Sequence, residues 1–278
     1  MKREYFENYA KDHFENESKQ LILKQINYFY DCLEKQKPIK KKYKIGEDVF
    51  LKKGTLLHGT FRNIEGLKDI VNNGLIASWF IDGRISKYPS SVGVWNLKKD
   101  YLLKDYINFY SGGTIRYYNQ HDTKKESEVI EYNKINDFIN RVIEKKYLVW
   151  QMEQTKEARF MPSLVQSQVQ IGIIFDVNNE YGNKLLSGDI LNHLNINDLV
   201  VKDFVNESYY ERFIVDRKDK DDFFTDRESA ILFGIPSNLI EGILVGRDYE
   251  NNKEILRKIK KLLPNAYICN LDGKVIVS

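Results

Sequence analysis

The sequence predicts an α+β protein in which a strand-rich domain follows a helical N-terminal extension. Two observations carry this prediction. Short apolar segments with strand character outnumber the helices that could cross between them, which favours α+β over a doubly wound parallel sheet. The first 45 residues have helical periodicity instead. Because 42% of the 278 residues are hydrophobic, the chain has enough apolar surface for a sizeable core.

The N-terminal extension spans residues 1–45. Residues 4–36 predict a helix, because apolar side chains recur along one face at helical spacing: Leu21, Ile22, Ile26, Phe29, Cys32 and Leu33. Pro38 and a run of lysines then end the helix. We therefore expect the main domain to cover residues 46–278.

The first part of the main domain alternates between strands and helices. We expect strands over residues 55–60 and 91–95. Gly74 is placed to end the helix that follows the first strand. A second helix is predicted over residues 100–110. The inner face of the first helix is formed by Ile64, Leu67, Ile70 and Val71.

The rest of the chain continues this alternation after a polar stretch. Residues 111–131 predict a loop, residues 135–145 a helix, and residues 169–177 a strongly apolar strand. The last third predicts strands at 211–215, 229–233, 240–245 and 266–270, with a helix over 251–263.

The charges of the chain are nearly balanced. Its 43 basic and 40 acidic residues give a net charge of +3, which by itself implies neither a nucleic-acid nor a membrane partner. The local exception is a run of lysines before the main domain: Lys35, Lys37, Lys40, Lys41, Lys42 and Lys44. Such a run is typical of a solvated linker, and phosphate binding is the alternative.

The remaining composition bears on compartment and cofactors. Cys32 and Cys269 lie far apart without a metal-binding spacing, which indicates reduced thiols in a cytoplasmic protein. The N-terminus lacks the apolar run of a secretory signal, and no stretch is long and apolar enough to span a bilayer, so we expect no membrane partner. The chain has only four histidines, and we expect no metal site.

The end of the first predicted strand combines residue types that suit a ligand site. His58 provides an imidazole and Thr60 a hydroxyl, and Gly59 between them lets a ligand approach the backbone closely. The strand is followed by a helix that leaves through Asn73-Gly74-Leu75-Ile76.

Two later segments add aromatic and acidic groups. Gly93-Val94-Trp95 ends the second strand, and Tyr106 lies in the helix after it. Both rings can stack on a flat aromatic cation. Asp226 and Glu228 open an apolar strand near the C-terminus, and their spacing of two residues is typical of one strand face.

Together these segments resemble ADP-ribosyltransferases of the diphtheria-toxin and poly(ADP-ribose) polymerase type, including bacterial toxins that modify DNA. The resemblance covers about residues 54–112 and 211–248. Two positions depart from the family pattern. Trp95 stands where the family has a tyrosine, and Leu103 stands where it has a small hydroxyl residue.

The resemblance implies a split β-sheet core flanked by helices and an enzyme that uses NAD as co-substrate. Glu228 would be the catalytic acid, His58 would bind the ribose, and Asp226 would position the acceptor. Gly59, Thr60, Trp95 and Tyr106 would complete the NAD site. Glu241, in the next apolar segment, is the fallback for the acid. The acceptor would be a protein, DNA or RNA, and the biological role that of a toxin, effector or phage-defence component.

Two other functions stay open at this point. An RNA 2′-phosphotransferase-like enzyme would share the fold but needs a second histidine in the pocket, which has no matching candidate here. A non-catalytic descendant that binds a nucleotide or a protein partner would explain Trp95 and Leu103.

Overall fold

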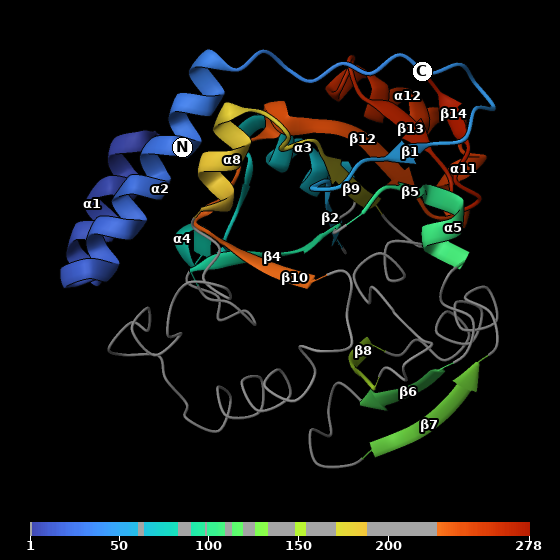
Figure 1. Cartoon of the computed structure of the whole chain (residues 1–278), viewed down its shortest axis with the longest axis horizontal. Helices are drawn as coiled ribbons and strands as arrows, with labels where there is room; N and C mark the ends of the chain where they lie inside the picture. The colour runs from blue at the N-terminus through green and yellow to red at the C-terminus, as the bar shows by residue number, and fades with distance from the viewer. Residues whose placement is uncertain are drawn as a thin grey trace.

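A seven-stranded sheet runs through the main domain of the computed structural model (Figure 1). The structure describes residues 2–60, 64–82, 90–97, 99–108, 113–118, 126–132, 148–153, 171–187 and 227–278. The strands lie in the order β10 (Arg227–Leu232), β4 (Ser91–Asn96), β2 (Leu56–Thr60), β9 (Ile171–Phe175), β12 (Ile240–Val245), β13 (Tyr267–Cys269) and β14 (Val275–Val277). All neighbours are antiparallel except β12 and β13, so the sheet is mixed and the protein is α+β.

Smaller sheets and helices complete the described part. The pairs are β1 (Phe50–Leu51) with β5 (Tyr101–Leu102), and β3 (Leu75–Ile76) with β11 (Gly234–Ile235). A third sheet places β6 (Gly113–Tyr118) between β7 (Glu126–Tyr132) and β8 (Leu148–Glu153). The helices of the main domain are α3 (Ile64–Asn73), α4 (Ser78–Asp82), α5 (Leu103–Asn108), α8 (Glu180–Leu186), α11 (Arg247–Glu250) and α12 (Lys253–Leu262), with the short 3₁₀ turn η3 (Ser237–Leu239).

One sequence prediction was wrong in this region. The loop predicted for residues 111–131 contains strands β6 and β7. Their sequences are rich in threonine, tyrosine, valine and isoleucine, which favour strands, but the interspersed charges hide the apolar signal. The predicted helix over 135–145 and the predicted strand over 211–215 lie outside the described residues.

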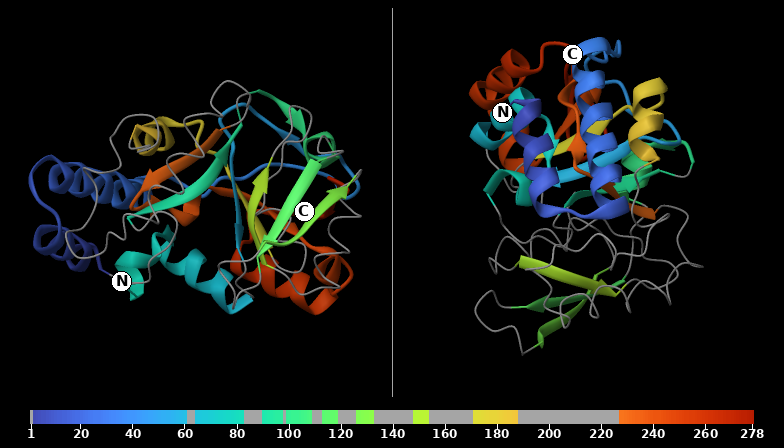
Figure 2. Two further views of the ribbon diagram at one scale, coloured as in Figure 1. Left: turned by 90° about the horizontal axis from the view of Figure 1, so that it is seen from below. Right: turned by 90° about the vertical axis from the view of Figure 1, so that its left-hand side faces the viewer.

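The N-terminal extension forms two helices rather than the single one predicted. α1 (Arg3–His13) and α2 (Asn16–Lys35) are separated at Phe14, whose backbone is extended, and Asn16 has a φ of +49°. Asparagine tolerates this left-handed conformation better than most residues, which permits the sharp turn. Figure 2 shows the two helices side by side.

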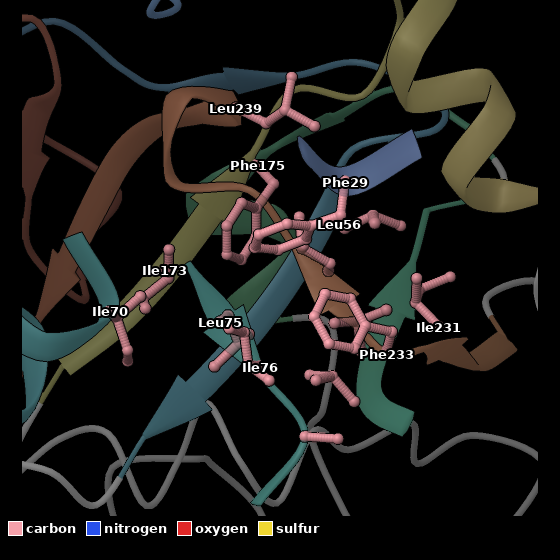
Figure 3. Packing of buried hydrophobic residues seen from close by; sticks show 14 of the residues in the cluster. Phe29, Leu56, Ile70, Leu75, Ile76, Ile173, Phe175, Ile231, Phe233 and Leu239 are labelled. Carbon is pink, nitrogen blue, oxygen red and sulfur yellow. The ribbon is translucent and has the colours of Figure 1, made fainter. Parts of the chain in front are cut away.

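Both N-terminal helices contribute to the same hydrophobic core as the sheet. Phe29 from α2 is fully buried in one cluster with Leu56 of β2 and Ile173 of β9 (Figure 3). Phe6 from α1 is fully buried in the same cluster. The end of α2 is also tied down by Asn238, whose amide donates to the carbonyls of Cys32 and Gln36 at 2.7 Å each. The boundary that we predict at residue 45 is thus crossed by a continuous core.

Phe233 lies at the centre of this core. Its ring makes edge contacts with Phe6, Phe29 and Phe80 at centroid distances of 5.0 to 5.2 Å. The residue has a φ of +67°, unusual for a bulky side chain, and turns the chain from β10 into β11. Its N–H donates to Ser90, just before β4, and its carbonyl accepts from Ala77, just before α4.

Gly74 gives a testable consequence of this packing. It ends α3 with a φ of +84°, and a Cβ there would lie 2.4 Å from the Phe29 ring. Gly46 has a similar φ of +88° but open space around its Cα. We expect Gly46→Ala to cost about 1–2 kcal/mol for the left-handed conformation alone. Gly74→Ala should cost about 1–3 kcal/mol more, because the ring must also move.

Urea unfolding of the two variants beside the parent chain measures both costs. Equal destabilisation by the two substitutions would show that the Phe29 ring does not pack on Gly74 as described.

Candidate functional site

The three segments singled out in the sequence occupy three consecutive strands of the large sheet. β2 ends in His58, Gly59 and Thr60, β4 contains Trp95, and β10 contains Glu228. The strand order β10-β4-β2 places them next to one another although they come from distant parts of the chain (Figure 1). Neighbouring strands are about 4.8 Å apart, so the backbones of β2 and β10 are about 10 Å apart.

The register between these strands is specific. Trp95 is the backbone partner of Leu57 on one side and of Glu228 on the other. The pairing of β4 with β10 continues along the whole strand, to Ser91 and Leu232. Between β2 and β4, the paired residues on β2 are Leu56 and Leu57, and His58 is the next residue along β2.

His58 contacts β4 through its side chain instead. Its Nδ1 lies 2.9 Å from the carbonyl oxygen of Gly93, and the ring is partly buried. Because a carbonyl only accepts hydrogen bonds, Nδ1 carries the hydrogen. In the neutral ring Nε2 is then an acceptor, which is the form that can accept a hydrogen bond from a sugar hydroxyl.

Three glycines lie near His58: Gly59 next to it on β2, Gly172 on β9 and Gly93 on β4. Gly59 is the direct partner of Gly172 on β9, and Gly93 is the partner of Ala230 on β10. Positions without a Cβ let a flat group approach the sheet closely. Gly172 was not among the predicted site residues, although a glycine inside an apolar strand is a sequence signal for such an approach.

Other parts of the predicted site cannot be compared with the structure. The side chains of Thr60, Trp95, Tyr106 and Glu228, and all of Asp226, lie outside what the structure describes. The backbone of Tyr106 belongs to α5. The assignment of these residues to an NAD site stays a prediction.

Glu241 lies in a different setting from the one expected of a catalytic acid. Its side chain is 1% exposed, and one carboxylate oxygen lies 2.5 Å from Nζ of Lys41. The other oxygen accepts from the Tyr267 hydroxyl at 3.3 Å. The same Lys41 ammonium also lies 3.1 Å from Asp176. A carboxylate enclosed in this way has its lone pairs directed at the protein, which argues against Glu241 as the fallback acid.

A β-bulge explains why Glu241 points at Lys41. On β12, Ile240 pairs with Phe175 and Gly242 pairs with Ile174, so Glu241 is an extra residue between two consecutive pairs. A bulge of this kind re-aims the side chain of the extra residue. Gly242 is required beside it, because a Cβ there would lie 2.4 Å from the Tyr267 ring.

The protonation states of this cluster follow from burial and charge. Burial raises the pKa of Glu241 above its usual value, although Lys41 counteracts this effect. The pKa of Lys41 is also raised: burial acts to lower it, but the charges of Glu241 and Asp176 outweigh burial. Lys41 is therefore charged, and its ammonium lies between the side chains of Glu241 and Asp176.

Lys41 therefore corrects the interpretation of the lysine run as a solvated linker. Lys35, Lys37, Lys40, Lys42 and Lys44 are exposed, but Lys41 is a partly buried ion-pair partner. The sequence signal for this pair was the isolated glutamate inside the apolar segment 240–245, since a buried charge needs a partner.

Within the described ranges, no group of three or more His, Cys, Asp or Glu side chains could hold a metal ion. In the same part of the chain, no helix is long and apolar enough to cross a membrane. No protein-family model, curated protein or solved structure matches the chain.

The Lys41–Glu241 pair gives a pH-dependent prediction. Lys41→Met removes the charge and leaves Glu241 buried, and we expect it to cost about 3–5 kcal/mol at pH 8. Losing Lys41 raises the pKa of Glu241 further. A carboxyl with a raised folded-state pKa contributes stability below its unfolded pKa, about 4.3, that is lost as the pH rises through the folded-state pKa. The cost should therefore be smaller at pH 5 than at pH 8.

Urea unfolding at both pH values measures this difference. Lys35→Met is a matched control, because Lys35 pairs with Asp31 on the surface of α2, and its cost should stay within about 0.5 kcal/mol. A Lys41→Met cost that does not change between pH 5 and pH 8 would contradict a buried, charged Glu241.

Proposed function

We propose that the protein is an NAD-dependent ADP-ribosyltransferase that modifies a macromolecular acceptor. The observation that carries this proposal is the adjacency of β2, β4 and β10. These strands bring the backbone positions of His58, Trp95 and Glu228 into one part of one sheet. Convergence of distant segments in one part of a sheet is what a composite site requires.

The finer fold assignment belongs to the same proposal. In an ADP-ribosyltransferase-like split sheet, β2 and β4 would flank the ligand. Two features favour this arrangement. The residues of β2 that pair with β4 are Leu56 and Leu57, and beyond them the His58 ring donates a hydrogen bond to the Gly93 carbonyl of β4. Glycines on β2, β4 and β9 would let the nicotinamide carboxamide approach the backbone.

The reaction would break the bond between the nicotinamide nitrogen and C1′ of the ribose. Nicotinamide leaves with the bonding electrons, and the sugar passes through an oxocarbenium-like state, as in glycoside hydrolysis. An oxygen or nitrogen of the acceptor then bonds C1′ and loses its proton. Glu228 would bond the ribose 2′-hydroxyl and stabilise the positive charge. His58 would accept a hydrogen bond from a ribose hydroxyl through Nε2.

The direct test is incubation with NAD that carries a label on the adenylate part. Release of free nicotinamide, together with transfer of label to protein, DNA or RNA in a lysate, is the expected result. The absence of both nicotinamide release and a thermal shift with NAD would overturn the proposal. ATP serves as the control nucleotide in the thermal-shift experiment.

Glu228→Gln tests the role of the acid. The substitution keeps the shape but removes the charge, and we expect turnover to fall at least about a hundredfold. The affinity for NAD should change little, since the carboxylate acts on charge that develops in the transition state. Glu254→Gln, an exposed glutamate on α12, should leave both quantities unchanged. Parallel loss of NAD affinity and turnover in Glu228→Gln would indicate a structural role instead.

Asp226→Ala tests how the acceptor is held. If Asp226 positions or deprotonates the acceptor, its loss should suppress transfer but spare slow hydrolysis of NAD. Water needs no docking group, whereas a macromolecular nucleophile must be aligned with C1′. Nicotinamide release and label transfer are measured on the same sample, and an equal fall in both would reject this role.

A further inference from the structure

The segment that joins α2 to β1 has two different sides. We define residues 36–45, which follow the end of α2, as the strap; it contains no helix or strand. Figure 1 shows it passing from α2 along the upper edge of the molecule toward the side of α12 and β14. In an extended chain, successive side chains point to opposite sides. The strap follows this rule over residues 39–44.

The residues on the inner side of the strap anchor it to the rest of the domain. The N–H of Ile39 donates to the Asn238 carbonyl at 3.0 Å. Lys41 binds Glu241 and Asp176, as described above. The Tyr43 ring makes an edge contact with Tyr267 at a centroid distance of 4.8 Å, and its hydroxyl donates to the carbonyl of Phe50 at 3.2 Å.

The outer side chains are all lysines. Lys40, Lys42 and Lys44 alternate with the anchors and are exposed. At two residues per step, neighbouring lysines are about 6–7 Å apart along the strap. Among the residues that the structure describes, none of these three lysines takes part in an ion pair.

The helix α12 adds further positive charge beside this row. Burial lowers the pKa of Lys260, and the positive charge of Lys40 acts in the same direction. The Lys260 ammonium donates to the Ala266 carbonyl at 2.9 Å. The other cations of this helix are Lys253, Arg257, Lys258 and Lys261.

From the anchored strap and its outward lysines, we propose that Lys40, Lys42 and Lys44 bind the phosphate backbone of a single-stranded nucleic acid. Like charges held close together repel each other, and a polyanion relieves that repulsion. A nucleic-acid strand offers one negative charge per nucleotide in a row, which suits a straight row of cations. Phe50, on the strand β1 that follows the strap, is exposed and offers an aromatic ring on which a base can stack.

A membrane surface fits these observations less well. Basic helices that bind membranes insert an apolar face into the lipid. In α12 that face is already occupied, because Ile259 is buried in the core and Ile255, Leu256 and Leu262 pack against it.

The proposal is tested with the full chain in the absence of NAD, so that the result does not depend on the enzymatic activity. Fluorescence anisotropy with a labelled oligonucleotide of about 20 nucleotides gives the affinity at several salt concentrations. The test variant is Lys40→Gln/Lys42→Gln/Lys44→Gln, which keeps Lys41 as the anchor. The control is Lys2→Gln/Lys11→Gln/Lys24→Gln, which removes the same charge from exposed positions on and before the N-terminal helices.

A plot of log K against log salt has a negative slope, to which each phosphate contact on a single strand contributes about 0.7. Because the strap variant lacks three lysines, we expect the magnitude of its slope to be smaller by about 2. Raising the salt from about 50 mM to about 200 mM lowers the affinity of both proteins. The factor by which the affinity falls should be about 20 times smaller for the strap variant than for the parent chain. The control variant should keep the parent slope. Unchanged thermal unfolding of both variants confirms that the fold is intact.

Three results would overturn the proposal. One is a parent chain that shows no salt-dependent binding to the oligonucleotide. Another is an equal loss of slope in both variants, which would indicate a general effect of net charge. The third is binding to vesicles that contain phosphatidylserine without binding to the oligonucleotide, which would identify a membrane surface instead.

Discussion

The packing of Phe233 is the constraint on which the described structure depends. A bulky residue with a φ of +67° costs about 1–3 kcal/mol and persists only where the surroundings fix it. Here the surroundings are three phenylalanine rings from α1, α2 and α4 and two backbone hydrogen bonds. Since Phe233 follows directly on β10, the N-terminal helices and the strand that carries Glu228 are fixed by the same residue. The extension is therefore part of the architecture that positions the candidate site.

The sequence predicted the apolar strands well and the breaks between elements poorly. β9 and β12 lie within the predicted ranges, because runs of isoleucine, leucine and valine leave little choice of structure. The division between α1 and α2 depends on the left-handed conformation of Asn16, which leaves no mark on the helical periodicity. The exceptional role of Lys41 was equally hidden. Its partners Asp176 and Glu241 are distant in sequence, so the neighbouring lysines gave no reason to single it out.

In the candidate site too, the sequence pattern predicts which segments come together, but tertiary packing determines where individual side chains point. Glu228 opens one apolar strand, and Glu241 lies in the next apolar segment. The sequence therefore ranks them as candidate catalytic acids only through the resemblance to a family. The bulge in β12 separates them physically, because it directs Glu241 into a buried ion pair. The hydrogen bond between His58 and Gly93 depends on where two strands part, which no local signal records. The adjacency of β2, β4 and β10, by contrast, agrees with the expectation that these segments belong together.

The capping of α2 by Asn238 has a consequence for biosynthesis. The amide of Asn238 reaches a carbonyl 206 residues earlier in the chain. A ribosome that adds about 5–20 residues per second leaves that carbonyl, and the apolar faces of both early helices, without their partners for about 10–40 s. During this interval the nascent chain exposes aromatic surface that chaperones recognise. Folding of this core can then finish only after the segment that carries Asn238 has emerged, so the N-terminal helices wait for the C-terminal part of the domain.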